Sequence, residues 1–298
     1  GQNSAGIAVR FRSDSPVIAV KWENTFNNSM KHMAPVGIKG LDLYCFIDGK
    51  WRFVNSAQPS GKTNQWQIIS GMDATEREYM LYLPLYDGIH SLQIGVAAPS
   101  HIGQPSLPYP DTRKPIVFYG SSITQGACAS RPGMAATNLI GRKLNVETIN
   151  LGFSGNAFID YEVAEMMAHV DASAYVLDYV PNASPEQILE KTEKFVRILR
   201  EKHPDVPLIF VEDPIFPHSK FDLRMAKEIK DKNDAMNQAF SSLKKQGLKK
   251  IYLVKGRSLI SANGESTVDG IHFTDCGFEQ YVDAILPILK KAINHKKK

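Results

Sequence analysis

The sequence has few cysteines, and their spacing matches no common cysteine motif. Cys45, Cys128 and Cys276 form no Cys-x-x-Cys pair, and three cysteines are too few for a disulfide framework. Because nothing in the sequence points to an oxidising compartment, we expect Cys128 and Cys276 to be free buried thiols. A disulfide between these two residues remains the alternative.

Long hydrophobic runs are also missing from the 298 residues. No run approaches the ~20 apolar residues of a spanning helix, so we expect no membrane span. The first residues lack the basic and then apolar pattern of an export signal. The compartment therefore stays open, with a secreted or periplasmic location after signal removal as one alternative.

Motifs for metals, nucleotides and nucleic acids are absent as well. The eight histidines form no His-Glu-x-x-His or Cys/His cluster, and the glycines form neither Gly-x-Gly-x-x-Gly nor a P-loop. The net charge of +4 is modest, and part of it belongs to the terminal lysines 296–298. We expect no metal, no cofactor and no nucleic-acid partner, while the oligomeric state stays open.

The composition, with 43% hydrophobic and 22% charged residues, indicates a globular chain of about two domains. Before residue 110, short alternating segments surround two Asp-Gly pairs, Asp48-Gly49 and Asp87-Gly88. Asp-Gly between alternating runs is typical of hairpins, because Gly tolerates the positive φ of a tight turn. We predict an antiparallel β-sandwich over residues 1–108, with a proline-rich connector over residues 105–115.

After the connector, apolar runs alternate with helical patterns. The runs cover residues 115–119, 148–151, 174–178, 207–211 and 251–254. This alternation predicts an α/β domain with parallel strands over residues 109–298. Ser184, Pro185 and Gln187 predict one helix start by a capping box.

Polar residues follow the predicted parallel strands, where an open sheet binds its ligands. Ser122, His272 and Asp269 are the residue types of a nucleophile, a general base and the carboxylate that orients that base. The Asp-x-x-His spacing lets one loop supply both partners of the serine. Backbone amides of Ser122 and Gly155 and the side chain of Asn182 are candidates for an oxyanion hole, where each donor contributes roughly 2.7 to 4 kcal/mol.

These residues resemble the motifs of the SGNH or GDSL hydrolase family. Gly120-Ser121-Ser122 is similar to the nucleophile block, Gly155 to the glycine block, Asn182 to the third block, and Asp269 with His272 to the last. The sequence Gly-Leu-Asp-Leu-Tyr at residues 40–44 resembles the GxDLY motif of a β-domain that precedes some SGNH esterases. The chain departs from the family pattern at Ser121 and Ala183, where Asp is usual, and this affects neighbouring hydrogen bonds.

The resemblance implies a three-layer α/β/α, flavodoxin-like catalytic domain with a parallel sheet, preceded by a jelly-roll-like β-domain. It also implies a serine esterase that acts on a small acyl ester, with acetyl on a carbohydrate as the expected case. The expected partner is a small-molecule or glycan ester. An acyltransferase with the same acyl-enzyme, and an inactive carbohydrate-binding protein, are the alternatives.

Several other residues have two interpretations. Gln125, Arg131 and Tyr179 line the site or are ordinary polar residues, and Asp213 favours a structural role because Asp-Pro often opens a turn. The three tryptophans, all within the first domain, form a sugar-stacking platform or fill the core, and we favour the core. Their positions are Trp22, Trp51 and Trp66.

Overall fold

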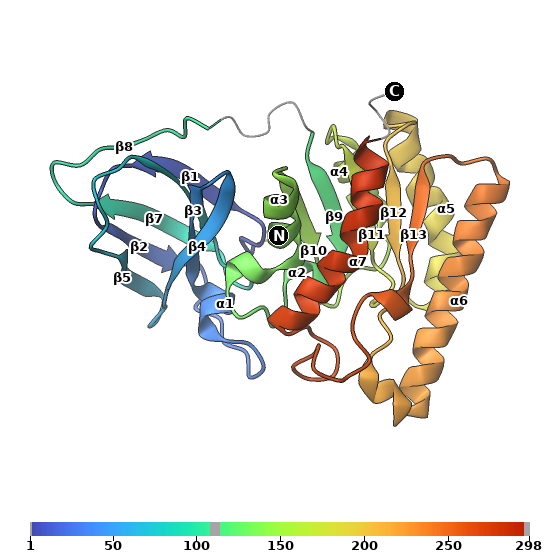
Figure 1. Ribbon diagram of the computed structural model, residues 1–298. Coiled ribbons are helices and arrows are strands. Elements are labelled where there is room, and N and C mark those ends of the chain that lie inside the picture. The colour runs from blue at the N-terminus through green and yellow to red at the C-terminus, as the bar shows by residue number, and fades with distance from the viewer. Residues whose placement is uncertain (1, 108–113, 295–298) are drawn as a thin grey trace. The chain divides into compact units, whose positions relative to one another are not determined.

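A computed structural model describes residues 2–107 and 114–294 (Figure 1). The chain contains two compact units, one made of Gly1–Asp111 with Gly126–Asn145 and the other of Thr112–Gln125 with Val146–Lys298. The segment Gly126–Asn145 thus groups with the first unit, although it follows part of the second in the sequence. The predicted boundary at residue 108, most of the connector and the terminal lysines lie outside the described residues.

The first unit contains two antiparallel sheets with a shared core. Its strands are β1 (Ala8–Ser13), β2 (Ile18–Asn24), β3 (Leu41–Ile47), β4 (Lys50–Ala57), β5 (Thr63–Ile69), β6 (Arg77–Tyr82), β7 (Ile89–Val96) and β8 (Ile102–Gly103). One sheet has the order β4-β3-β6-β1-β8 and the other β5-β2-β7. Phe11, Trp22 and Leu43, from different strands, belong to one buried apolar cluster. The expected antiparallel fold of this region is confirmed.

The two Asp-Gly pairs have different roles. Asp48 and Gly49 both have positive φ and join the paired strands β3 and β4, as expected for a hairpin turn. The second expected hairpin is wrong, because β6 and β7 lie in different sheets. The Asp87 carboxylate instead accepts hydrogen bonds from the backbone N–H groups of residues 26, 27, 28 and 88 and closes a loop.

The GxDLY motif holds the segment Gly126–Asn145 within the first unit. Asp42, fully buried on β3, accepts hydrogen bonds from Arg131 Nη1 (2.9 Å), Gly133 N (2.8 Å) and Ser56 Oγ (2.7 Å). Tyr44 accepts a hydrogen bond from Arg131 at 2.6 Å. The segment contains η1 (Pro132–Met134) and α3 (Ala136–Leu144), and α1 (Pro35–Lys39) completes the helices of this unit.

The second unit is built on a parallel sheet with the order β10-β9-β11-β12-β13. Its strands are β9 (Ile116–Gly120), β10 (Thr148–Gly152), β11 (Ala174–Asp178), β12 (Leu208–Val211) and β13 (Ile251–Val254). Its helices are α2 (Ser122–Gln125), α4 (Tyr161–Ala168), α5 (Pro185–Lys202), α6 (Leu223–Lys245) and α7 (Asp275–Asn294), with 3-10 turns η2 (Pro217–Lys220) and η3 (Gly256–Ser258).

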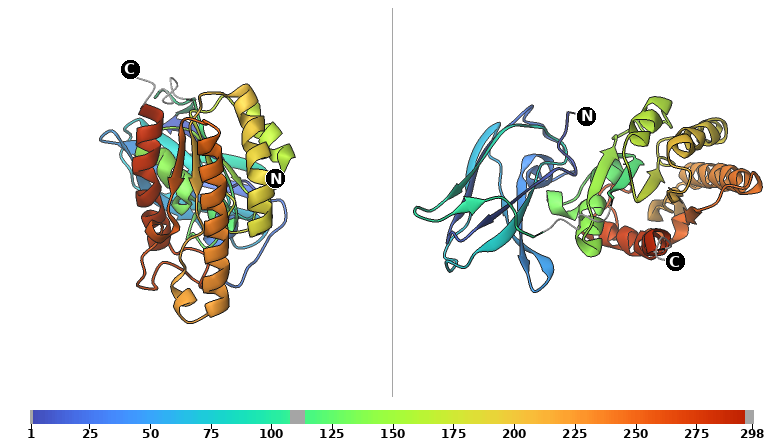
Figure 2. Two further views of the ribbon diagram at one scale, coloured as in Figure 1. Left: turned by 90° about the vertical axis from the view of Figure 1, so that its right-hand side faces the viewer. Right: turned by 90° about the horizontal axis from the view of Figure 1, so that it is seen from above.

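Helices cover both faces of this parallel sheet. Helices α4, α5 and α6 lie on one face and α7 lies on the other, which gives three layers (Figure 2). Residues of β9, β11 and β12 pack with those of α4, α5 and α6 in one buried cluster. Ser184 and Gln187 form the expected capping box at the start of α5. The predicted α/β fold with parallel strands is confirmed.

The tryptophans and cysteines differ in burial. Trp22 lies in the core and donates from Nε1 to Lys39 O at 3.1 Å, whereas Trp51 is half-buried and Trp66 is 36% exposed. All three cysteines are free. The expectation of buried thiols holds for Cys128 and is wrong for Cys276, which is exposed on the surface of α7.

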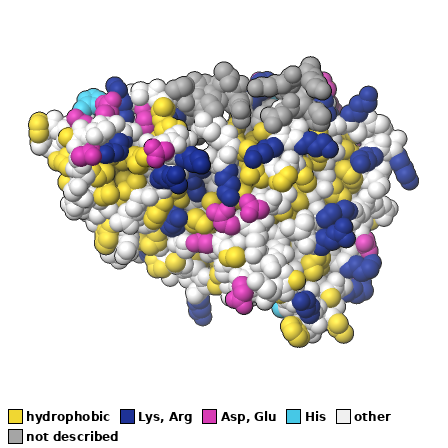
Figure 3. Space-filling model, viewed as in Figure 1, with side chains coloured by type: hydrophobic (Ala, Val, Ile, Leu, Met, Phe, Trp, Pro, Cys, Tyr) yellow, Lys and Arg dark blue, Asp and Glu magenta, His cyan; other side chains and the backbone are white. Residues whose placement is uncertain are grey.

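Two properties of the molecule bear on its partners. None of the helices in the described part of the chain is long and apolar enough to cross a membrane. On the face shown in Figure 3, Lys and Arg side chains lie in scattered groups with Asp and Glu among them. The expectation that nucleic acid is not a partner stays a prediction.

Candidate active site

Ser122 is the first residue of α2, a single helical turn directly after β9. This turn lies very close to the strand ends. A Cβ atom added to Gly152 would lie 2.2 Å from Gln125 N, and one added to Gly120 would lie 2.1 Å from Thr124 Oγ1. Side chains at these two positions would push the turn away from the sheet. The two glycines therefore allow α2 its position.

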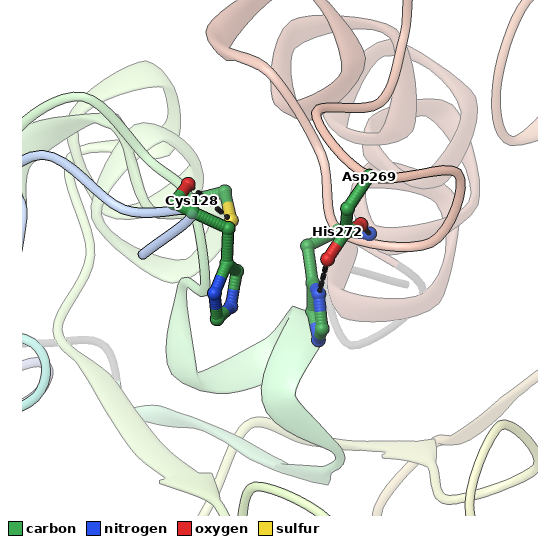
Figure 4. A group of neighbouring side chains, drawn as sticks. Cys128, Asp269 and His272 are labelled. Carbon is green, nitrogen blue, oxygen red and sulfur yellow. Dashed lines mark hydrogen bonds and ion pairs between the residues drawn. The ribbon is translucent and has the colours of Figure 1, made fainter. Parts of the chain in front are cut away.

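Ser122, His272 and Asp269 form a continuous chain of hydrogen bonds. Ser122 Oγ lies 3.0 Å from His272 Nε2, and His272 Nδ1 lies 2.7 Å from Asp269 Oδ2. Figure 4 shows the Asp269 carboxylate and the His272 ring turned toward each other on one loop. With the proton on Nδ1 donated to Asp269, the unprotonated Nε2 is the ring atom that faces Ser122 Oγ. The structure thus brings together three residues that the sequence separates by up to 150 positions.

The loop that carries Asp269 and His272 is closed on itself. Thr267 and Phe273 form an antiparallel bridge, and Val268 N donates to His272 O at 2.8 Å. Gly270 has a φ of +93°, a conformation that favours glycine. This closure lets the Asp-x-x-His spacing place both side chains on the same side of the loop.

The Asp269 carboxylate is stabilised in its charged form. Partial burial acts to raise its pKa, but hydrogen bonds from the His272 side chain and from the backbone N–H groups of His272 and Ile271 outweigh it. The pKa of Asp269 is lowered to about 2. A carboxylate that is ionised at neutral pH can fix the imidazole tautomer and stabilise an imidazolium.

The three side chains differ in their exposure to solvent. Ser122 is 8% exposed, and the side chains of His272 and Asp269 are 22% and 34% exposed. Ser122 is therefore largely withdrawn from solvent, whereas the His272 ring and the Asp269 carboxylate keep partial contact with it.

The candidate oxyanion-hole residues lie on segments tied to α2 or to each other. Gly155, with a φ of +69°, lies in a turn closed by the bond from Asn156 N to Phe153 O. Gln125, the last residue of α2, accepts a hydrogen bond from Ser154 N at 3.2 Å. The Oδ1 atom of Asn182 accepts one from Ala157 N at 3.3 Å, so its Nδ2 donor faces the other way. Their role as oxyanion donors stays a prediction.

A buried carboxylate at the end of a predicted strand, to which the sequence by itself gave no role, lies beneath α2. Asp178, the last residue of β11, accepts hydrogen bonds at Oδ2 from Thr124 Oγ1 (2.9 Å) and Tyr281 OH (2.7 Å). Burial raises its pKa to about 7, against the effect of these two hydrogen bonds. Its position at the end of a predicted strand was the only available signal in the sequence.

The remaining candidate residues have structural contacts. Tyr179 is fully buried and its hydroxyl lies 3.0 Å from Thr192 Oγ1, so it belongs to the core. Gln125 is buried and accepts a hydrogen bond from Ser154 N, in the turn that contains Gly155. Arg131 forms an ion pair with Asp42 in the first unit. Asp213 is buried two residues beyond the end of β12, with its Oδ2 atom 4.0 Å from Lys232 Nζ.

Comparisons with known proteins support a single family. Residues 113–290 match the model of the GDSL-like lipase/acylhydrolase family, and residues 1–102 match that of the GxDLY N-terminus of SGNH hydrolase-type esterases. No curated protein matches the sequence.

Solved structures agree with the family models. A crystal structure from Bacteroides ovatus, described as a GDSL-like lipase, is 41% identical with a TM-score of 0.94, covering 98% of this chain and 86% of that one. A salicylyl-acyltransferase from a tetracycline biosynthetic pathway is 18% identical (TM-score 0.76, 97% and 83% covered). A family two carbohydrate esterase from Clostridium thermocellum is 12% identical (TM-score 0.68, 98% and 94% covered). The last two share the fold. The chain, with its N-terminal GxDLY region, its α/β SGNH fold and its family match over most of its length, belongs to the GDSL-like lipase/acylhydrolase family.

Proposed function

We propose that the protein is a serine esterase that hydrolyses small acyl esters through a Ser122-linked acyl-enzyme. The observation that carries this proposal is the chain of hydrogen bonds from Ser122 Oγ through the His272 ring to Asp269, at 3.0 and 2.7 Å. A serine hydroxyl is a weak nucleophile at neutral pH, and a correctly placed imidazole corrects this. Membership of an acylhydrolase family supports the same reaction class.

The proposed reaction has two stages. His272 Nε2 takes the serine proton as Ser122 Oγ bonds to the carbonyl carbon, and the oxyanion formed is stabilised by the amides of Ser122 and Gly155 and the side chain of Asn182. The imidazolium then gives its proton to the leaving alcohol oxygen, which leaves an acyl-enzyme. Water attacks this ester with His272 as base, and the acid departs. Asp269 stabilises the imidazolium at each stage.

For the substrate, we propose a short acyl group, with acetyl on a carbohydrate as the first candidate. A structural relative is described as a family two carbohydrate esterase in complex with cellohexaose. Another is described as a salicylyl-acyltransferase. Acyl transfer is the alternative reaction, in which an alcohol rather than water accepts the acyl group from the acyl-enzyme.

The decisive experiment compares the two adjacent serines. Purified full-length protein is expected to release the phenol from a short-chain aryl ester, and Ser122→Ala should reduce kcat at least about 10⁴-fold. Ser121→Ala is the matched control, because Ser121 is buried and, among the residues that the structure describes, its Oγ accepts a single hydrogen bond, from Ile123 N at 3.3 Å. Its kcat should stay within about threefold of the unsubstituted protein. Absence of turnover together with absence of labelling by a fluorophosphonate would refute the proposal.

The role of Asp269 can be tested separately. Asp269→Asn removes the charge that stabilises the imidazolium and permits the wrong tautomer, so kcat should fall about 10⁴-fold while the thermal midpoint changes little. The measurement is steady-state hydrolysis with a melting curve of each variant. An Asp269→Asn variant with undiminished kcat would remove this residue from the mechanism.

The substrate class requires a panel of esters. Acetylated oligosaccharides, acetylated small alcohols and aryl esters of increasing acyl length should be compared by kcat/KM, with acetyl sugars expected to rank first. Adding a sugar or alcohol acceptor during turnover distinguishes the outcomes. Free acid as the main product supports the esterase, whereas a new ester as the main product supports the acyltransferase.

A further inference from the structure

Asp178 occupies a central position in the second unit. It ends β11, which lies between β9 and β12, and it pairs in register with Gly120, two residues before Ser122. Its side chain is 1% exposed, so water cannot satisfy the carboxylate. The protein must supply its hydrogen-bond donors.

The two donors come from the two segments that carry the reacting groups. Thr124 lies in α2, two residues after Ser122, and donates from Oγ1 at 2.9 Å. Tyr281 lies in α7, the helix that follows the His272 loop, and donates from its hydroxyl at 2.7 Å. Both bonds end on the same atom, Oδ2. One buried oxygen therefore joins the nucleophile helix to the helix behind the general base.

The nucleophile helix depends on such external contacts. A single turn of four residues gains little stability from its own hydrogen bonds. The distance between Ser122 Oγ and His272 Nε2 must nevertheless stay within about 0.5 Å of the value that allows proton transfer. Side-chain bonds from α2 to a rigid strand end supply this restraint, and α7 shares the same anchor.

The burial of Asp178 is costly. Removal from water raises its pKa to about 7, although both hydroxyl donors act to lower it. A carboxylate is a stronger acceptor for two O–H groups than a neutral amide, because charge-assisted hydrogen bonds are shorter and stronger. An apolar residue would avoid the cost but would leave Thr124 and Tyr281 without this acceptor.

We propose that Asp178 is a positioning residue, which holds α2 and α7 in the register that brings Ser122 and His272 together. This proposal rests on the proposed function, since it assigns Asp178 to the same serine mechanism. Asp178 does not touch the reacting atoms in this account. It acts through Thr124 and Tyr281.

The neighbouring strand provides a matched control. Asp213 lies two residues beyond the end of β12, is also nearly completely buried, and also has its pKa raised to about 7 by burial. Its surroundings are different, because Asn233 binds its backbone and Lys232 lies 4.0 Å from its Oδ2. The charge of Asp178 also acts to raise the pKa of Asp213, so the two carboxylates are close enough to interact. Asp213→Asn therefore removes a neighbouring buried carboxylate, and its charge, without removing a hydrogen bond to Thr124 of α2 or Tyr281 of α7.

The experiment measures kcat, KM and the rate of fluorophosphonate labelling of the full-length protein. For Asp178→Asn we expect kcat and the labelling rate to fall about 10- to 100-fold with KM within about twofold, as for a misplaced catalytic group. Asp213→Asn should keep all three quantities within about twofold. Equal losses in both variants, or an unchanged kcat in Asp178→Asn, would overturn the proposal.

A hydroxyl series tests the same bond without changing the carboxylate. Thr124→Val removes the donor with little change in shape and should lower kcat, whereas Thr124→Ser should restore most of it. This series also decides the question if Asp178→Asn does not fold. Equal activity of the Val and Ser variants would refute the proposal. If the unsubstituted protein has no activity, the proposed function fails instead, so the two failures are distinguishable.

Discussion

Two carboxylates near the ends of neighbouring strands, Asp178 and Asp213, differ in what surrounds them. Both carboxylates are buried. Asp178 Oδ2 accepts hydrogen bonds from two hydroxyl groups, whereas Asp213 Oδ1 has no hydrogen-bond partner among the described residues. Burial is the largest effect on the pKa of Asp213 and raises it to about 7, while the charge of Lys232 acts in the opposite direction. Asp213 is therefore a local source of instability when it is ionised.

This environment predicts a pH dependence of stability. An unfolded Asp titrates near 3.8 and the folded Asp213 near 7, so the folded state holds the proton between these values and loses stability as the pH rises through them. Asp213→Asn removes this effect. We expect the variant to be roughly 1–3 kcal/mol more stable than the unsubstituted protein at pH 8.

Urea unfolding at pH 5 and pH 8 measures the effect. The advantage of Asp213→Asn should shrink at pH 5, where the native carboxyl is mostly protonated. The expectation would be contradicted if the unfolding free energy of the unsubstituted protein and that of Asp213→Asn fell by the same amount from pH 5 to pH 8. Activity serves as a check that the variant is folded.

At the scale of elements, the position of α2 depends on its close approach to the strand ends. Backbone atoms of Gln125 lie where a side chain at Gly152 would be, and Thr124 lies where one at Gly120 would be. The same turn is bonded by Asn150 Nδ2 to Thr124 O at 2.9 Å. Ser122, the proposed nucleophile, is therefore placed by β10 as well as by β9, which ends two residues before it.

Gly152→Ala tests this packing. The added methyl group would displace α2, so we expect esterase kcat to fall about 10- to 100-fold and the unfolding free energy to fall by about 1–3 kcal/mol. Gly61→Ala is the control, because a Cβ there meets nothing within 4 Å. Steady-state hydrolysis and urea unfolding give both quantities. A Gly152→Ala variant with control-like kinetics would show that α2 tolerates displacement.

At the scale of the whole molecule, the two units are interleaved along the chain. The segment Gly126–Asn145 leaves the second unit directly after α2, groups with the first unit, and returns at β10. Within the first unit, Asp42 and Tyr44 bind Arg131, and Arg142 lies over the Tyr44 ring at 4.1 Å. These contacts give the GxDLY motif a structural role.

The interleaving predicts that the hydrolase half is not independent. A shortened chain of residues 114–298 would keep this segment but lose Asp42 and Tyr44, so its buried polar and apolar groups would be exposed. We expect this chain to be poorly soluble or to melt at a much lower temperature, with esterase activity below a tenth of the full-length value. Circular dichroism melting and ester hydrolysis check both points.

A matched pair of full-length variants locates the cause. Asp42→Asn weakens the contact with the segment, whereas Glu78→Gln changes a similarly buried acid that instead binds Ser106 and Leu107. If activity depends on the contact between the GxDLY motif and the segment Gly126–Asn145, kcat should fall more in Asp42→Asn than in Glu78→Gln when both variants lose the same unfolding free energy. A shortened chain with full activity and an unchanged melting temperature would contradict the expectation.

Local patterns in the sequence by themselves determined the parallel strands, the Asp48-Gly49 hairpin and the Ser184 capping box, because each depends on residues a few positions apart. The motif residues Ser122, His272 and Asp269 were also identifiable, since their types and order carry the chemistry. The sequence could not show that the folded chain brings Ser122 and Asp269 within hydrogen-bond distance of the His272 ring.

The tertiary structure alone decided what depends on distant residues. It placed β6 and β7 in different sheets, because burial of Tyr79 and Leu81 against a shared core outweighed the turn signal at Asp87-Gly88. It assigned residues 126–145 to the first unit through contacts with strand β3, nearly 90 positions earlier in the chain. It also joined Thr124 and Tyr281 on Asp178. Such contacts follow from the packing of elements, and neighbouring residues in the sequence carry no signal for them.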